Sequence, residues 1–152
     1  MIINWDQYFI GVASLSRLRS KDPSTQVGAC IVNEHKRIIG IGYNGFPLGV
    51  EDATFPWQQE GSFLDSKYAY VVHAEANAIL NATPSLRDAT LYVNLFPCNE
   101  CAKLIIQSGI KEVVYSSDKY AEKDFTIASK RMFAAANVTL RQIAEVDVDI
   151  KL

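Results

Sequence analysis

The stretch HAEANAILNATPSLRDATLYVNLFPCNECAKLIIQSGIKEVVYSS, residues 73–117, decides the fold class of this chain. Segments 73–82 and 98–109 look like helices, and segments 89–94 and 112–117 look like short strands. A helix that connects two such strands favours parallel pairing through a right-handed crossover. The stretch therefore predicts an α/β fold.

The segments before residue 73 add a helix and an antiparallel pair of strands. Apolar side chains recur at helical spacing over residues 4–19, and Asn4 with Gln7 forms a capping-box pattern at the start. The apolar runs 27–33 and 37–43 predict a hairpin of two strands.

The segments after residue 117 predict a helix near 122–136 and a last strand over 138–144. The whole chain is therefore expected to form a five-stranded mixed sheet with helices on both faces, a three-layer α/β/α arrangement. Because no repeat, low-complexity segment or Gly/Ser linker interrupts residues 1–152, we expect a single domain.

A long segment without regular periodicity, residues 44–70, separates the hairpin from the α/β core. Loops of this length inside a compact domain are usually functional or disordered. Four aromatic residues favour a packed, ordered loop: Phe46, Phe55, Trp57 and Phe63.

The composition is that of a soluble globular protein, with 49% hydrophobic and 21% charged residues. A formal net charge of −2 argues against a domain that mainly binds nucleic acid, because such domains usually carry a basic surplus. The chain shows no apolar run long enough to span a membrane and no secretory pattern at its start. With only three cysteines, a reducing, cytoplasmic setting is expected.

Four residues in two short motifs carry the chemistry. His73 and Glu75 form His-x-Glu, and Cys98 with Cys101 follows Pro97 as Pro-Cys-x-x-Cys; together these are the signature of zinc-dependent deaminases. Catalytic zinc takes three protein ligands and keeps one position open for water. The signature thus predicts His73, Cys98 and Cys101 as ligands, with Glu75 beside them.

Each motif has a plainer explanation when it is taken alone. His73 could cap a helix, the cysteine pair could be a redox motif, and Glu75 could complement a helix dipole. Cys30 lies in an apolar run and His35 in the hairpin turn, so neither is expected to bind metal. We therefore predict one zinc ion per subunit.

The signature also predicts the roles in the reaction. Zinc lowers the pKa of a bound water from about 15.7 to roughly 7. Glu75 would take a proton from this water and deliver protons to N3 of a cytosine ring and to the departing ammonia.

Four segments, in order and at suitable spacing, resemble the deoxycytidylate (dCMP) deaminase family: SKDPSTQVGACIVN, GIGYNGFPLG, KYAYVVHAEANAI and LFPCNECAKLIIQSGIKEVVYSSDKY. The resemblance covers nearly the whole chain. It implies a cytidine-deaminase-like fold, hydrolysis of dCMP to dUMP in support of thymidylate synthesis, and a homo-oligomer, commonly a hexamer.

The resemblance also implies substrate contacts. Asn44 matches a substrate-contacting asparagine of the wider superfamily, and the Ala74 backbone would hold the pyrimidine carbonyl. Lys21, Lys119 and Tyr120 lie in loops expected at the rim of the site and would meet the 5′-phosphate. Asn44 could also be a plain turn residue, and the other three could be solvated surface.

Members of the family are typically activated by dCTP and inhibited by dTTP, usually with Mg²⁺, at a site between subunits. Gly42, Tyr43, Asn44 and Gly45 resemble part of this effector site, where glycines would let backbone N–H groups approach phosphates. A tight turn would explain the glycines nearly as well.

The alternatives include other substrates and one non-catalytic role. The enzyme could act on another nucleotide such as dCTP, on a free nucleoside or on a polynucleotide, although the net charge disfavours the last. The chain could also be a zinc-containing module that only binds nucleotides. Glu75 argues against this module, because a binder needs no carboxylate beside an open zinc position.

Overall fold

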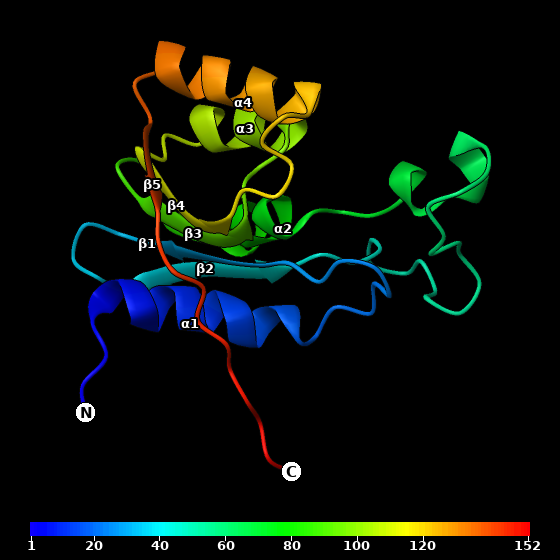
Figure 1. Cartoon of the computed structure of the whole chain (residues 1–152), viewed down its shortest axis with the longest axis horizontal. Coiled ribbons are helices and arrows are strands. Elements are labelled where there is room, and N and C mark those ends of the chain that lie inside the picture. Colours follow the sequence, from blue (N-terminus) through cyan, green and yellow to red (C-terminus); the bar gives the residue numbers. More distant parts are fainter.

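The computed structural model describes all residues, 1–152, as five strands and four α-helices (Figure 1). The strands form one sheet of order β2-β1-β3-β4-β5. Their bounds are β1 Gly28–Val32, β2 Ile38–Tyr43, β3 Thr90–Leu95, β4 Glu112–Ser117 and β5 Thr139–Gln142. The helices are α1 Trp5–Arg17, α2 Ala74–Asn81, α3 Asn99–Gln107 and α4 Asp124–Ala135.

The sheet is mixed, as the sequence predicts. β1 pairs antiparallel with β2 and with β3, whereas β3, β4 and β5 run parallel to one another. The hairpin and the two parallel crossovers are therefore both confirmed.

The helices form two outer layers on the sheet. In Figure 1, α1 lies below the sheet, and α2, α3 and α4 lie above it. Each face has its own apolar core, and β3 serves both because alternate side chains of a strand point to opposite faces. Leu91 and Val93 belong to the core on the α2–α4 side, and Tyr92 belongs to the core on the α1 side. The three-layer α/β/α fold is confirmed.

Two glycines let helices approach the sheet closely. A Cβ atom at Gly28 would lie 1.8 Å from the Ala13 carbonyl oxygen of α1, and one at Gly42 would lie 2.4 Å from the Ala74 carbonyl oxygen of α2. No side chain fits at these distances. The position of α2, which begins beside His73, therefore depends on Gly42.

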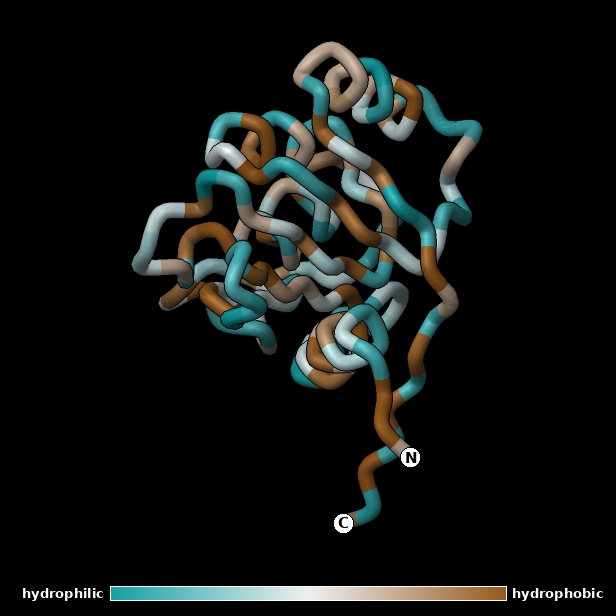
Figure 2. Tube along the Cα trace, turned by 90° about the vertical axis from the view of Figure 1, so that its left-hand side faces the viewer, coloured by the Kyte–Doolittle hydropathy of each residue, from teal (hydrophilic) through white to brown (hydrophobic).

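Both chain termini lie on the α1 side of the molecule (Figures 1 and 2). The capping box at Asn4 and Gln7 is present, with hydrogen bonds of 2.8 and 2.9 Å. The segment after β5 returns along α1, where Arg17 pairs with Glu145 at 2.8 Å. None of the helices has the length and apolar character needed to cross a membrane.

The long segment after β2 is an ordered loop closed at its neck. Gly45 and Val72 exchange two backbone hydrogen bonds of 3.0 and 2.8 Å, one residue after Asn44 and one before His73. Inside the loop the Phe46 and Trp57 rings stack at 4.0 Å, and Phe55 packs edge-on against Tyr70 at 5.0 Å. Phe63 does not join this cluster: it is 67% exposed, so the packing expected for it is wrong.

Candidate active site

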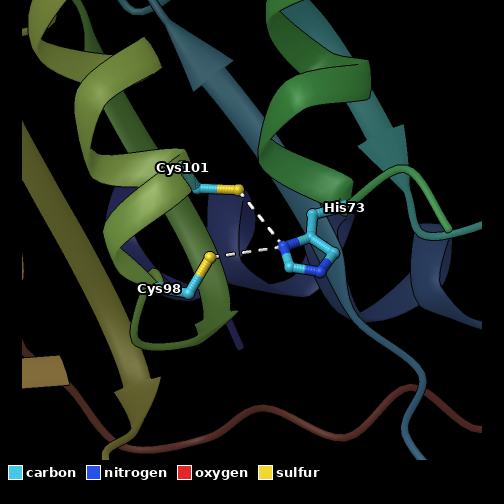
Figure 3. A group of neighbouring side chains, drawn as sticks. All are labelled: His73, Cys98 and Cys101. Atoms are coloured by element: carbon cyan, nitrogen blue, oxygen red, sulfur yellow. Dashed lines mark hydrogen bonds between the residues drawn. The ribbon is translucent and has the colours of Figure 1, made fainter. Parts of the chain in front are cut away.

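The His-x-Glu and Cys-x-x-Cys motifs meet where two helices begin. His73 is the N-cap of α2, Cys98 is the N-cap of α3, and Cys101 lies one turn into α3. The three side chains point toward one another (Figure 3). Pro97 precedes the N-cap of α3 and so lies outside the helix.

The spacing of the donor atoms fits a metal ion. Nδ1 of His73 lies 3.4 Å from each cysteine sulfur, and the three donor atoms all lie within 4.8 Å of one another. Zinc binds sulfur at about 2.3 Å and imidazole nitrogen at about 2.0 Å, so tetrahedral ligands lie roughly 3.5 Å apart. Two sulfurs and one nitrogen, with no fourth side chain, are the donor set of a catalytic zinc site.

The other cysteine and histidine lie elsewhere. Cys30 is fully buried in the core beneath α1, and burial raises the pKa of its thiol to about 12. His35 lies in the hairpin turn with 77% of its side chain exposed. Neither belongs to the group of potential metal ligands.

The ligand cluster favours a thiolate. The hydrogen bond with Cys101 is the largest of the effects that lower the pKa of Cys98 to about 4, and it raises that of Cys101. The hydrogen bond with Cys98 raises the pKa of His73 to about 9, against burial and the nearby charge of Lys67. A thiolate at a helix N-terminus is also the form that binds a metal.

Glu75 lies in the first turn of α2, beside the ligand cluster. It is 5% exposed, and burial raises the pKa of its carboxyl group to about 7. The charges of His73 and Cys98 act on it in opposite directions. A carboxyl group with this pKa can both accept and release a proton near neutral pH, as a general acid–base requires.

Asn44 is buried next to the loop neck, and its amide is engaged by the segment before β1. Its Oδ1 accepts a hydrogen bond from the backbone of Val27 at 2.9 Å. Its Nδ2 donates to the Thr25 carbonyl at 2.9 Å and to Asp22 at 3.4 Å. Both donor hydrogens are therefore used, and one lone pair of Oδ1 remains for another donor.

Two ion pairs join the segment before β1 to the long loop. Lys67 and Asp22 pair at 2.8 Å with side chains only 8% and 1% exposed, whereas the adjacent Lys21 pairs with Asp52 in a largely exposed position. The sequence reasoning named Lys21 but missed Asp22 and Lys67. Asp22 and Lys67 lie 45 residues apart, so no local pattern indicates that they pair. Only the apolar and aromatic residues that follow Lys67 in KYAYVV could have indicated that this lysine is buried.

Lys119 and Tyr120 lie in the turn after β4. Since β3 and β4 run parallel, this turn leaves the same edge of the sheet as the segment that leads to Cys98. The ammonium group of Lys119 lies 5.1 Å from the centre of the Tyr120 ring. Next to them, Asp118 pairs with Lys130 of α4 at 3.0 Å.

The residues expected at an effector site differ in what surrounds them. Gly42 is buried against α2, and the carbonyl of Tyr43 accepts a hydrogen bond of 2.8 Å from Asn77. A Cβ atom at Gly45 would meet nothing within 4 Å. Gly42 is therefore explained by packing within the fold, and Gly45 is not.

Residues 3–117 match the family model described as the cytidine and deoxycytidylate deaminase zinc-binding region. The chain belongs to this family. Deoxycytidylate deaminases of mouse and human are each 54% identical to it over 142 residues, which cover 92% of this chain and 80% of theirs.

The family fold is shared with more distant solved structures. The dCMP deaminase of cyanophage S-TIM5, solved in complex with dCMP and dUMP, matches with a TM-score of 0.74 at 23% identity, over 94% of this chain and 99% of that one. Its apo form matches with a TM-score of 0.71. At this identity the likeness concerns the fold, which agrees with the cytidine-deaminase-like architecture expected from the sequence.

Proposed function

We propose that the chain is a zinc enzyme that hydrolyses dCMP to dUMP and ammonia. The observation that carries this proposal is the buried Glu75 beside the His73, Cys98 and Cys101 cluster, in a chain 54% identical to mouse deoxycytidylate deaminase. A module that only bound nucleotides would gain nothing from burying a carboxyl group at the cluster.

The residues of the site divide the chemistry between them. His73, Cys98 and Cys101 hold zinc, which when bound makes a water molecule acidic enough to react near pH 7. Glu75 would accept a proton from this water and pass it to ring N3, and would then take the second proton from the new hydroxyl group on C4 and pass it to the departing amino group. A C4–O bond forms, the C4–N bond breaks, and one water is consumed for each ammonia released.

Several groups are suited to hold the nucleotide. Ala74 is the first residue of α2, and so its backbone N–H has no partner within the helix and can donate to the pyrimidine carbonyl. Asn44 keeps one acceptor position. Lys119, Tyr120 and Lys21 supply charge and a hydroxyl group for the 5′-phosphate, although Lys21 would have to leave Asp52.

The test is ammonia release by the zinc-loaded protein with dCMP, deoxycytidine, dCTP and a short single-stranded DNA as substrates. We expect turnover of dCMP alone, and a loss of at least about 100-fold in kcat for Glu75→Gln with zinc content unchanged. Turnover of dCTP instead of dCMP would support the alternative nucleotide substrate. A protein that binds dCMP but converts none of these substrates would contradict the enzymatic role.

Regulation by dCTP and dTTP, with Mg²⁺, is the second part of the proposal. Gly45 supports it: a Cβ atom there would meet nothing within 4 Å, so the backbone at this position is open to a phosphate group or to another subunit. Gly42, Tyr43 and Asn44 precede it in the same segment, and a site shared between subunits calls for a homo-oligomer, with a hexamer expected. Saturation curves for dCMP that neither nucleotide changes would contradict the regulation, and sedimentation of a monomer would contradict the assembly.

A further inference from the structure

The Asp22–Lys67 pair is the most deeply buried pair of opposite charges in the molecule, and it lies outside the chemistry described above. Burying two charges is costly unless hydrogen bonds satisfy them. Here Oδ1 of Asp22 accepts from the backbone N–H groups of Ser24 and Thr25 at 2.8 and 3.1 Å. Its Oδ2 accepts from Lys67 and from Asn44.

Lys67 connects this carboxylate to the chain that leads into the ligand cluster. Its backbone N–H donates to Gln58 within the loop at 2.9 Å, and its carbonyl accepts from Val71 at 2.9 Å. Val72 then closes the loop neck with Gly45, and His73 follows. The ion pair therefore ties the segment before β1 to the residues immediately before a metal ligand.

Asp22 also fixes the direction of the Asn44 amide. Because its carboxylate and the Thr25 carbonyl both accept from Nδ2, the amide cannot flip without placing its oxygen against two acceptors. The remaining lone pair of Oδ1 is thereby held in one orientation next to the loop neck.

We propose that Asp22 and Lys67 are positioning residues for substrate binding, which set Asn44 and the loop neck relative to His73. This inference rests on the proposed function. Since the pair acts on groups that hold the nucleotide rather than on Glu75, its loss raises KM for dCMP and leaves kcat nearly unchanged.

The experiment measures KM and kcat for dCMP per zinc-loaded, folded subunit. We expect Lys67→Met and Asp22→Asn each to raise KM about tenfold or more, with kcat within about threefold of the wild type. The double variant should raise KM by far less than the product of the two single effects, because both remove one interaction. Lys67→Arg, which keeps the charge, should recover part of the loss.

The matched control is Glu145→Gln, which breaks the ion pair with Arg17 on the α1 side of the molecule and should change KM less than about twofold. Should a single variant fail to fold, the double variant still decides, because it leaves neither charge buried without a partner. An active wild type with unchanged KM in the folded variants would overturn this inference alone. A wild type without activity on dCMP would overturn the proposed function and the inference with it.

Discussion

The two sides of the candidate active site are held in place in different ways. On one side, His73, Cys98 and Cys101 stand at the first residues of α2 and α3, which the apolar core fixes against the sheet. On the other side, Asn44 and the loop neck are irregular backbone, held by a buried ion pair and two backbone hydrogen bonds.

Because of this difference, substitutions on the two sides should affect the reaction and the stability of the fold to different extents. Cys101 is buried in the apolar core and Cys98 packs against it, but alanine at either position removes only a sulfur atom. Their replacement should therefore abolish the reaction at a cost of only about 1 kcal/mol in stability. The charges on the loop side are buried and mutually satisfied, so the loss of one leaves its partner unpaired. Variants on the ligand side should therefore lose far more kcat than stability, whereas variants on the loop side should lose stability and keep most of kcat.

The largest expected effect is on the ligand side. Cys101→Ala removes one of three ligands, and we expect loss of the bound zinc and a fall in dCMP turnover of more than about 1,000-fold. Atomic emission measures the zinc, and far-ultraviolet circular dichroism should show unchanged secondary structure.

Cys30→Ala is the matched control for this prediction. It removes the same atom from the opposite face of the sheet, where the thiol is buried among apolar side chains. We expect full zinc content and activity, with a loss of about 1 kcal/mol in stability. Zinc retained by Cys101→Ala, or lost by Cys30→Ala, would show that the ligand assignment is wrong.

The second effect is on the loop side and concerns stability. Lys67→Met leaves the Asp22 carboxylate buried without its counter-charge, and we expect a loss of about 3 kcal/mol in the free energy of unfolding, measured with urea. Lys21→Met breaks the neighbouring exposed pair and should cost less than about 1 kcal/mol. Equal losses for the two variants would contradict the difference in burial.

The same comparison explains what could be predicted from the sequence. The metal ligands could be predicted from local signals. Each of their motifs spans only a few residues and lies where the apolar periodicity predicts the start of a helix. The loop side depends on which distant residues meet. Lys67 and Asp22 pair across 45 residues of irregular chain, and no periodicity indicates the path between them. The prediction that Phe63 packs within the loop was wrong for the same reason, because the number of aromatic residues in a loop does not indicate which rings turn inward.

The third effect tests how the fold positions α2. A methyl group at Gly42 would collide with the backbone of Ala74 and Ala78, and we expect Gly42→Ala to cost about 2 kcal/mol and to reduce dCMP turnover by displacing α2. Gly45→Ala, three residues on, has open space around it and should leave the unfolding curve unchanged. A stable Gly42→Ala variant would mean that α2 can move away from β2 without loss.

The smallest effect is electrostatic and lies far from both sides of the site. Asp6 of α1 accepts two hydrogen bonds from Arg141 of β5, at 2.8 and 3.0 Å, and these lower the pKa of its carboxyl group from 3.8 to about 2. Tyr92 of β3 donates to the same carboxylate at 2.7 Å. The pKa of Asp6 is lower in the folded chain than in the unfolded chain, so the unfolded chain binds the proton first as the pH falls. The contribution of the charged Asp6 to the free energy of unfolding is therefore complete above about pH 4.

The Asp6→Asn variant isolates this contribution. At pH 7 we expect it to be less stable than the wild type by about 1 kcal/mol, a value reduced from that of a buried pair because both partners are about a third exposed. The difference between the two proteins should shrink as the pH falls from 4 towards 2, since Asp6 is then protonated in the folded wild type as well. Urea unfolding at pH 7, 4 and 3 measures it, and a difference that stays constant over this range would mean that Asp6 stabilises the protein through its shape rather than its charge.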